Sequence, residues 1–365
     1  MKKSISLLLM GAALLGCINS PKSASALKEI GTMPSFERGY EQGVSACYAA
    51  VHNDTLYIAG GCNFPEIPAA QGGSKRYYKG IYKAAIGDTL HWEKAGTLPT
   101  ASAYGASTQY GSHLIIVGGM NTDEALTTVL SIDMANGCKS DTLPSLPCSI
   151  ENCAGAISRD LLFVTGGNCN GKPSNRTFML NLGDSIKRWE ELPPMPSRAR
   201  VQPVCAATND ALYVWGGFTP SDSTGGAHTH TDGVCYNINE KRWTALPDVT
   251  DNDTPVSLSG GTAILATDEC SIVAAGGVNS EIFTDAISGC YQLIKKEDYM
   301  HQKPEWYRFN PRLMLYNTAN GKWETVERNT SFARAGAIMV RHNDNILYIG
   351  GELKPGIRTP QIHIR

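Results

Sequence analysis

The sequence predicts an all-β protein, a six-bladed β-propeller, and two observations support that prediction. Six apolar, β-rich runs each end in a Gly-Gly pair, and successive pairs lie 58, 48, 50, 60 and 74 residues apart. A tryptophan and a Leu-Pro turn follow several of the pairs, as at Trp92, Trp189 and Trp243. Propeller blades repeat at roughly 50 residues. The six pairs are Gly60-Gly61, Gly118-Gly119, Gly166-Gly167, Gly216-Gly217, Gly276-Gly277 and Gly350-Gly351.

Each repeat is expected to form one four-stranded blade of the kelch type. The runs before the glycines, such as residues 56–59 and 212–215, are typical of buried strands. Glycine suits the ends of these strands because side chains have little room where blades converge on the axis. Among 37 glycines some pairs arise by chance, but six pairs behind the same kind of run indicate a repeat.

The two ends of the repeat series are complementary. Residues 27–34 resemble an outer strand without its tryptophan, and residues 43–50 begin the first full blade. After Gly351 only residues 352–365 remain, enough for a loop and one strand at 361–365. We therefore expect the N-terminal strand to complete the last blade, which removes exposed sheet edges and closes the ring.

An export signal precedes the first blade. Lys2 and Lys3 stand before an apolar run at 5–15, and Leu14-Leu15-Gly16-Cys17 resembles a bacterial lipoprotein processing site. We expect residues 1–17 to form this signal segment with Cys17 lipidated, residues 18–26 a tether, and residues 27–365 one propeller domain. The alternative is an ordinary signal peptide cut after Ala26. Either way the protein is expected to be exported. With Cys17 lipidated, it is expected to be a periplasmic or outer-membrane-anchored lipoprotein of a Gram-negative-type bacterium.

The charge of the chain indicates which partners to expect, and its cysteine content indicates disulfides. The formal net charge is −2, and no basic stripe is available to neutralise phosphates, so nucleic acid is not an expected partner. Eleven cysteines in an exported chain favour some disulfides. Loop cysteines are the better candidates, either Cys138 with Cys148 or Cys62 with Cys169, although the connectivity is open. Cysteines on inner strands, namely Cys47, Cys153 and Cys205, are expected to be buried thiols.

Long insertions are expected on one face of the ring, where the loops between second and third strands emerge together with the connections between blades. They occupy residues 62–80, 218–233 and 278–312. Such insertions commonly build a binding site over a rigid scaffold. The third insertion contains the charged and aromatic stretch 295–306, which forms either a short helical lid or a loop that merely covers blade edges.

The densest polar group follows the last glycine pair. Glu352 comes directly after the pair, and Arg358 follows the Pro355-Gly356 turn. A carboxylate near the axis suits a general acid or base, and an arginine can hold a substrate carboxylate by two hydrogen bonds. Alternatively, the two side chains simply pair with each other. Amides at equivalent places in other blades are candidates for substrate contact, namely Asn63, Asn121 and Asn279.

Two further arginines and two histidines are considered for the same face. Arg200 and Arg334 lie at connections between blades and are candidates for contact with an anion, although solvated arginines are common at such places. His228 and His230 could bind a metal, but their Gly-Ser-Thr-rich surroundings favour a solvated pair. We therefore expect no metal site.

The segment Gly-Glu-Leu-Lys-Pro-Gly-Ile-Arg-Thr at 351–359 resembles a motif of the bacterial N-acetylneuraminate epimerases, which are exported kelch propellers. Other pieces match in rotated order, for example 53–61 and 276–279, so the chain resembles a cyclically permuted mutarotase. The resemblance implies that Glu352 is the catalytic acid and base, that Arg358 lies in the substrate cavity, and that Lys354 belongs to the motif. It implies a sialic acid substrate and no cofactor.

Two functions are therefore considered. The first is a sialic acid mutarotase that interconverts the α and β anomers of N-acetylneuraminate. The second is a non-catalytic carbohydrate-binding or protein-interaction kelch propeller, because a fold does not assign a function. Departures from the family pattern, such as Tyr77-Tyr78-Lys79 in the first insertion, leave the preferred sugar open. Glu352 separates the two functions, since a binder has no need of a carboxylate that transfers protons.

Overall fold

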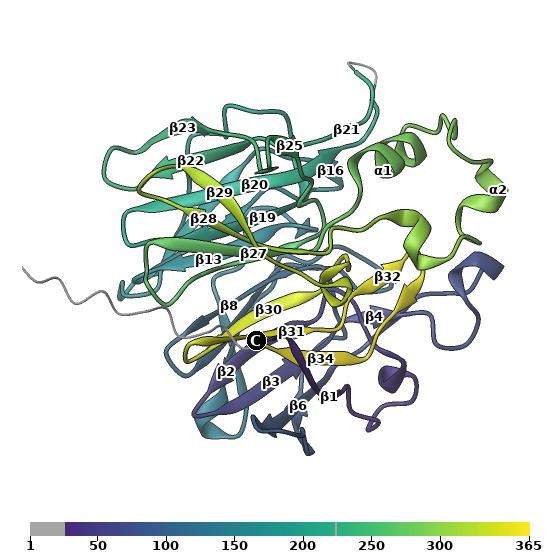
Figure 1. The fold of residues 1–365 in the computed structure, drawn as a ribbon. Helices are drawn as coiled ribbons and strands as arrows, with labels where there is room; N and C mark the ends of the chain where they lie inside the picture. The colour runs from purple at the N-terminus through teal and green to yellow at the C-terminus, as the bar shows by residue number, and fades with distance from the viewer. Residues whose placement is uncertain (1–25, 223–224) are drawn as a thin grey trace, which may run out of the picture.

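The predicted six-bladed propeller is confirmed by a computed structural model, which describes residues 26–222 and 225–365. Six antiparallel sheets of four principal strands are arranged around an axis (Figure 1). Each of the six apolar runs forms the second strand of a blade. The expected signal segment at 1–17, Cys17 and nearly all of the tether lie outside the described residues.

The blades are formed by consecutive segments of the chain, except the sixth. The strands of blade one are β2 (Tyr48–His52), β3 (Thr55–Ala59), β6 (Gly80–Ala85) and β7 (Trp92–Thr97). Those of blade two are β8 (Ala106–Tyr110), β9 (His113–Val117), β10 (Val129–Asp133) and β11 (Lys139–Leu143). Those of blade three are β13 (Ala154–Ser158), β14 (Leu161–Thr165), β17 (Thr177–Asn181) and β18 (Trp189–Glu191). The strands of blade four are β19 (Val201–Ala207), β20 (Ala211–Thr219), β22 (Gly233–Asn237) and β23 (Arg242–Leu246). Those of blade five are β26 (Thr262–Leu265), β27 (Ser271–Ala275), β28 (Arg312–Asn317) and β29 (Lys322–Arg328). Those of blade six are β30 (Ile338–His342), β31 (Asn345–Ile349), β34 (Gln361–Ile364) and β1 (Lys28–Thr32).

The N-terminal strand completes the sixth blade, as the sequence predicts. β1 pairs antiparallel with β34, from Lys28 opposite Ile364 to Thr32 opposite Gln361 (Figure 1). The indole Nε1 of Trp92 donates a hydrogen bond to the carbonyl of Thr32 at 2.7 Å, which ties blade one to the strand that ends blade six. The tryptophans of blades three and four make the same kind of bond to the preceding blade, each worth about 1 kcal/mol.

Apolar side chains fill the interfaces between neighbouring blades rather than one central core. Six clusters of buried residues each join strands of two adjacent blades. The cluster between blades six and one contains Ile30, Tyr40, Leu347 and Ile362, all 3% exposed or less. Because every blade packs on two neighbours, stability depends on closing the ring.

A closed ring of six backbone hydrogen bonds surrounds the axis just before the inner strands. At each position the N–H donates to the carbonyl of the equivalent residue in the preceding blade, at 2.7 to 3.2 Å, and the last bond returns to the first blade. All six residues have φ between 54° and 71°, in the left-handed region. The inner strands also contact one another in cyclic order, β30 next to β2. The six residues are Ala46, Tyr104, Asn152, Gln202, Gly260 and Gly336.

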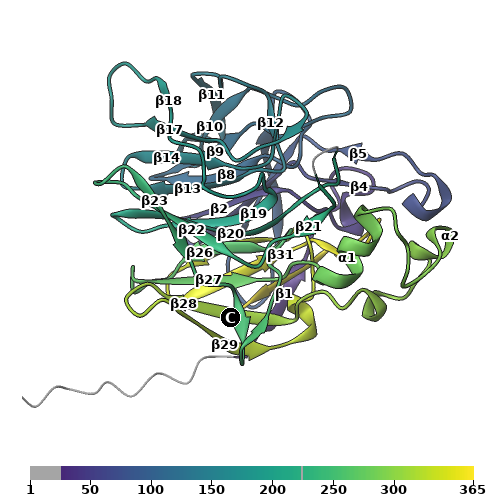
Figure 2. The same ribbon diagram turned by 90° about the horizontal axis from the view of Figure 1, so that it is seen from above.

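The insertions gather on one face of the ring, as expected, at the right of Figures 1 and 2. The third insertion contains short helices, which confirms its helical character. Its helices are α1 (Ser280–Ile287), α2 (Lys296–Tyr299) and the 3-10 turn η4 (Pro304–Tyr307). The 3-10 turns elsewhere in the described residues are η1 (Tyr40–Gln42), η2 (Ala69–Gln71), η3 (Met134–Asn136) and η5 (Thr330–Phe332). The short strands are β4 (Cys62–Asn63), β5 (Arg76–Tyr77), β12 (Ile150–Glu151), β15 (Asn168–Cys169), β16 (Lys172–Pro173), β21 (His228–Thr229), β24 (Thr250–Asp251), β25 (Thr254–Pro255), β32 (Glu352–Lys354) and β33 (Ile357–Arg358).

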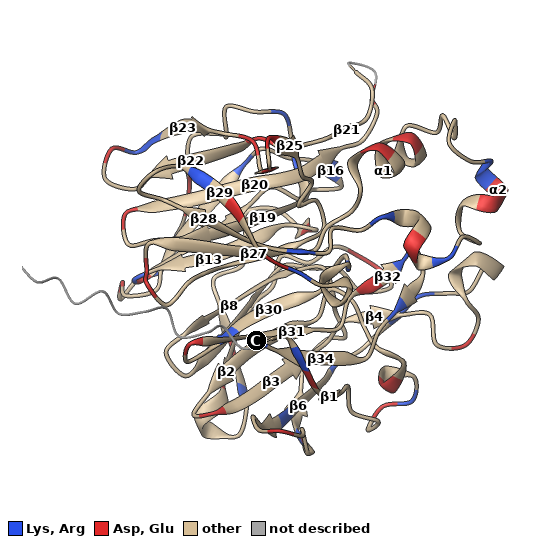
Figure 3. Ribbon diagram, in the orientation of Figure 1, with Lys and Arg blue, Asp and Glu red and all other residues tan. Residues whose placement is uncertain are grey.

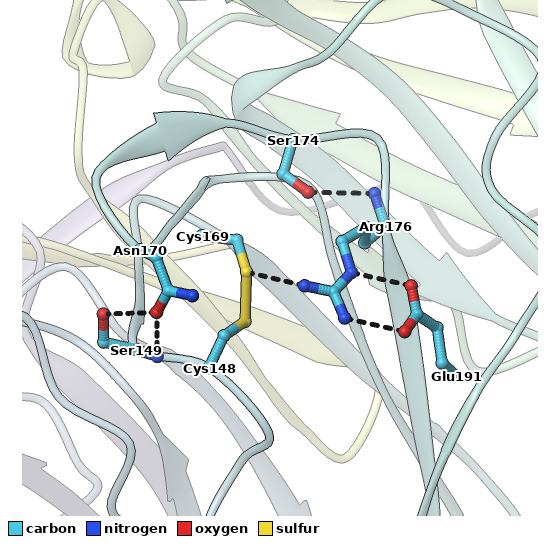
Figure 4. Close-up of a disulfide and its surroundings, with 7 residues drawn as sticks. All are labelled: Cys148, Ser149, Cys169, Asn170, Ser174, Arg176 and Glu191. Carbon is cyan, nitrogen blue, oxygen red and sulfur yellow. Dashed lines mark hydrogen bonds and ion pairs between the residues drawn. A yellow bond between two sulfur atoms is a disulfide. The ribbon is translucent and has the colours of Figure 1, made fainter.

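One disulfide joins Cys148 to Cys169, so both candidate pairings from the sequence are wrong (Figure 4). The bond links the connection before blade three to that blade's own loop, because β12 pairs with β15 and brings the two cysteines together. Cys62 and Cys138 are buried free thiols. Cys205 is buried on inner strand β19 as expected, and Cys47 is buried directly before β2, while Cys153, directly before β13, is partly exposed.

Charges of both signs are interspersed over the ribbon (Figure 3). The Arg176 guanidinium, for example, forms two hydrogen bonds to Glu191 at 2.6 and 2.7 Å beside the disulfide (Figure 4). Among the described residues, no helix has both the length and the apolar character that a membrane span requires.

Candidate functional site

The polar group predicted from the sequence lies where the channel meets the face with the insertions. The residue after each glycine pair lies beside the connection that leads into the same blade's inner strand. Isolated bridges join Ser45 to Cys62 and Ala335 to Glu352, and in blade three Glu151 pairs with Asn168. These connections contain the six residues of the hydrogen-bonded ring. Glu352 therefore lies next to the ring that encircles the axis.

Glu352 and Arg358 are held together by a short hairpin. β32 pairs with β33, and Glu352 lies directly opposite Arg358. Nη1 of Arg358 lies 2.8 Å from Oε1 of Glu352, in an orientation that makes an ion pair rather than a hydrogen bond. The same oxygen accepts the N–H of Gly356 at 2.7 Å. The alternative that the two residues pair with each other is thus realised, and the pair lies at the predicted place.

The ion pair is unequally exposed. The side chain of Arg358 is 3% exposed and that of Glu352 is 24% exposed. Nε of Arg358 donates to Oγ of Ser45 at 3.1 Å, and the guanidinium lies 5.0 Å from the ring centroid of Phe64. Burial alone would lower the pKa of Arg358, but Glu352 and Tyr104 raise it above its usual value. Arg358 is therefore fixed and charged, while Glu352 reaches solvent.

A second cation lies against the same aromatic ring. Nζ of Lys75 is 5.9 Å from the centroid of Phe64 and 4.6 Å from that of Tyr104, and it donates to the Tyr104 hydroxyl at 2.9 Å. Burial holds the pKa of Tyr104 well above its usual value. In the described part of the chain, no carboxylate lies within ion-pair distance of Lys75. Its charge is therefore available to a ligand.

Lys354 binds the third insertion instead of facing the ion pair. Its Nζ donates to the carbonyls of Met300 and Gln302, at 3.2 and 2.6 Å. The insertion has its own apolar cluster, which includes Tyr307 and Phe309 and packs against Ala335. Lys354 thus fixes this insertion beside the hairpin that carries Glu352 and Arg358.

A second carboxylate lies at the ring, in blade three. Glu151 is 9% exposed, and its Oε1 accepts a hydrogen bond from Nδ2 of Asn168 at 2.5 Å. Its Oε2 accepts from Nδ2 of Asn152, whose own Oδ1 accepts from Nε2 of Gln202 at 2.8 Å. Burial raises the pKa of Glu151, and the Asn168 bond and the charge of Lys75 oppose that shift only in part.

The three amides proposed from the sequence have structural hydrogen bonds. Asn63 is 2% exposed; its Nδ2 donates to the carbonyls of Gly39 and Gly43, and its Oδ1 accepts from Tyr78. The side-chain oxygen of Asn121 accepts from the backbone of its own turn, and that of Asn279 caps α1 by accepting from the N–H of Ile282. These contacts favour a structural role over substrate contact.

Arg200 and Arg334 are also structural, contrary to the expectation of anion contact or solvation. They are 0% and 1% exposed, and the Nη1 of each donates to the carbonyl of the first glycine of its own blade's pair, Gly216 or Gly350. Arg200 also pairs with Asp232. Each guanidinium therefore satisfies backbone carbonyls inside a blade, where neither water nor substrate reaches it.

The histidines are not a solvated pair, because His230 is 3% exposed and contacts the Thr219 hydroxyl at 2.8 Å. Among the described residues, no group of three or more His, Cys, Asp or Glu side chains could hold a metal ion. Below the ring, the inner strands enclose a cavity of about 860 Å³. The cavity is lined largely by small residues such as Ala49, Ala106 and Ala156.

Sequence reasoning missed Glu151, Asn152 and Gln202, and it did not assign a role to Lys75. One signal could have identified Asn168 and its partner Glu151. Asn168 stands directly after its glycine pair, the same position that Glu352 occupies in blade six. Lys75 lies in an insertion whose sequence does not repeat in the insertions of other blades, so the repeat does not indicate which residues Lys75 contacts.

Comparison with known proteins supports the sequence resemblance. The family model of N-acetylneuraminate epimerase matches residues 143–365. N-acetylneuraminate epimerases of Haemophilus influenzae (strain PittEE) and Pasteurella multocida (strain Pm70) are 30% and 32% identical over 250 and 251 residues. Each match covers 66% of this chain but only 64% and 62% of the relative's length. A linear alignment of a permuted chain would leave a segment unmatched in this way.

The fold has a solved counterpart. A structure described as "Structure of YjhT" superposes with a TM-score of 0.63 at 16% sequence identity, covering 92% of this chain and 99% of the other. At that identity the likeness concerns the fold alone. The family model matches more than half of the chain, and it includes the hairpin with Glu352 and Arg358. The chain therefore belongs to the N-acetylneuraminate epimerase family.

Proposed function

We propose that this protein interconverts the α and β anomers of N-acetylneuraminate. The observation that carries the proposal is the Glu352–Arg358 pair, with its N···O distance of 2.8 Å, beside the ring at the channel mouth. The carboxylate is the more exposed partner, and it is oriented through Oε1 by Arg358 and Gly356. Among the described residues Oε2 has no hydrogen-bond donor, so this oxygen can face a sugar.

Glu352 would act as the proton-transfer group. Ring opening requires removal of the proton from the anomeric hydroxyl, formation of the carbonyl, cleavage of the bond to the ring oxygen and protonation of that oxygen. The open sugar rotates about one bond and recloses on the other face of the carbonyl. The carboxylate is held beside the fixed guanidinium of Arg358 and would accept the first proton. The reaction needs no metal or cofactor.

The cations at the site suit a sugar that is itself an acid. Arg358 and Lys75 both lie against Phe64, and Glu352 balances one of the two charges. One positive charge remains for the substrate's carboxylate. Arg358 is nearly buried and already paired, whereas Lys75 is partly exposed and has no carboxylate partner in the described structure. We assign the direct contact with the sugar's carboxylate to Lys75. Arg358 would lie deeper in the site and contribute its charge from there.

We further propose that the protein works outside the cytoplasm, anchored by a lipid on Cys17. The support is the sequence of the first 17 residues, in which an apolar run ends directly at Leu-Gly-Cys. Metabolic labelling with a fatty acid analogue tests this proposal. Label is expected on the wild-type protein and not on Cys17→Ala, and equal labelling of the two would contradict it.

The function is tested by NMR exchange between the α and β signals of N-acetylneuraminate. Wild-type protein is expected to accelerate exchange, and Glu352→Gln to abolish the acceleration without loss of the folded spectrum. Glu324→Gln, an exposed change on β29, is the matched control and should behave as wild type. If Glu352→Gln exchanges as fast as wild type, the second function, a non-catalytic carbohydrate-binding propeller, is favoured instead.

A further inference from the structure

We infer that Glu151 is a second proton-transfer residue, which faces Glu352 across the channel mouth; this inference rests on the proposed function. Glu151 belongs to blade three and Glu352 to blade six. The inner strands contact one another in the cyclic order β2, β8, β13, β19, β26, β30, so blade three is three steps from blade six in either direction. In a ring of six blades these two are opposite.

Both carboxylates lie at the same level of the channel. Glu151 directly precedes Asn152, one member of the hydrogen-bonded ring. Glu352 bridges Ala335, which directly precedes Gly336, the ring member of blade six. A sugar bound over the ring would therefore have one carboxylate on each side.

The two carboxylates have unlike surroundings. Glu352 is paired with the guanidinium of Arg358. Glu151 is oriented by two amides and, among the described residues, has no cation within ion-pair distance. A buried carboxylate without a cationic partner is costly for stability alone, so its position at a channel mouth points to a function. Burial raises its pKa, as expected of a group that holds a proton.

A network of side chains from two blades holds Glu151 in place. Gln202 in blade four orients Asn152, and Asn152 and Asn168 each donate to one oxygen of Glu151. The neighbouring disulfide joins Cys169, the residue after Asn168, to the segment that precedes Glu151. The carboxylate is therefore positioned before any substrate binds.

Two carboxylates allow each proton of the reaction its own carrier. In ring opening, Glu352 takes the proton of the anomeric hydroxyl, and the electron pair of the breaking ring bond goes to the ring oxygen, which takes a proton from Glu151. In closure on the other face, ionised Glu151 takes that proton back as the hydroxyl attacks the carbonyl. Glu352 then returns its proton to the carbonyl oxygen. Both side chains end as they began.

The active form carries a proton on Glu151, so the rate is expected to depend on pH. The other titratable groups that influence Glu151 are Lys75, which lowers its pKa, and Tyr77 and Cys153, whose own pKa values its charge raises. The rate should fall at alkaline pH as Glu151 loses its proton.

The test measures anomer exchange by NMR against pH for the wild type, Glu151→Gln and Asn168→Ala. We expect Glu151→Gln to lower the rate about a hundredfold or more and to remove the alkaline limb, because general acid catalysis typically contributes on the order of 10²–10⁴-fold. Asn168→Ala removes a hydrogen bond that favours the ionised form. Its alkaline limb should therefore move to higher pH, an effect that a merely structural role would not give.

Controls separate this inference from the proposed function. Glu151→Asp, which keeps a carboxyl group, should be more active than Glu151→Gln, and Glu324→Gln should match the wild type. An active wild type together with a Glu151→Gln variant of unchanged rate and profile would overturn the inference and leave the proposed function standing. A wild-type protein that does not accelerate exchange would overturn both.

Discussion

Replacing Ile30 with alanine tests whether the N-terminal strand closes the ring. Ile30 lies in β1, is 3% exposed, and packs with Leu90 and Ile362 in the cluster between blades six and one. The substitution removes three buried carbons, worth about 0.8 kcal/mol each, and a partly collapsed cavity adds up to about 1 kcal/mol. We expect the free energy of unfolding to fall by about 2.5–3.5 kcal/mol.

The assay is urea unfolding followed by tryptophan fluorescence, to which Trp92 contributes from its bond to Thr32. The matched control is Val326→Ala on β29, where the side chain is 43% exposed and the expected loss is below about 0.5 kcal/mol. Equal midpoints for the two variants would refute the packing of β1. Deleting residues 26–32 tests the pairing itself, because an unpaired β34 edge should promote aggregation.

Two further predictions concern substrate charge and acid stability. Lys75→Met should raise KM for N-acetylneuraminate about fivefold to tenfold with little change in kcat, because roughly 1 kcal/mol of charge interaction is lost. Lys79→Met is the exposed control. Equal KM values for the two variants would contradict the contact between Lys75 and the sugar's carboxylate. His363 is 5% exposed, and burial together with Arg334 lowers its pKa to about 4. The unfolded chain thus binds more protons between pH 6.5 and 4, so stability should fall as pH drops through that window, and His363→Gln should flatten the fall in denaturant titrations.

The repeat made most of the fold predictable. Strand positions follow from the apolar runs, and the pairing of β1 with β34 follows from the incomplete ends of the series. Glu352 and Arg358 were also predictable as neighbours, since a Pro-Gly turn brings residues six apart into one hairpin. Each of these inferences needs only local sequence and the period of the repeat.

Asn63, Asn121 and Asn279, the amides predicted to contact substrate, are each the second residue after a glycine pair. Residues on an extended segment alternate between two sides. The first residue after a glycine pair, Glu352 or Asn168, takes part in the polar groups near the ring. Asn63, a second residue, points instead to the carbonyls around η1. Arg200 and Arg334 were misjudged because their carbonyl acceptors become neighbours only through the fold.

The residue types at the six positions of the backbone ring differ between the blades, and the difference follows the position of the site. All six ring residues have left-handed φ, which glycine adopts freely and other residues only at a cost of about 1–2 kcal/mol. Glycine or alanine occupies the three positions of blades five, six and one, beside Glu352 and Arg358. Blades two, three and four carry Tyr104, Asn152 and Gln202 instead, and these side chains bind Lys75 and Glu151 or orient one another. Since the fold would favour glycine at all six positions, the three larger residues are best explained by the chemistry at the channel mouth.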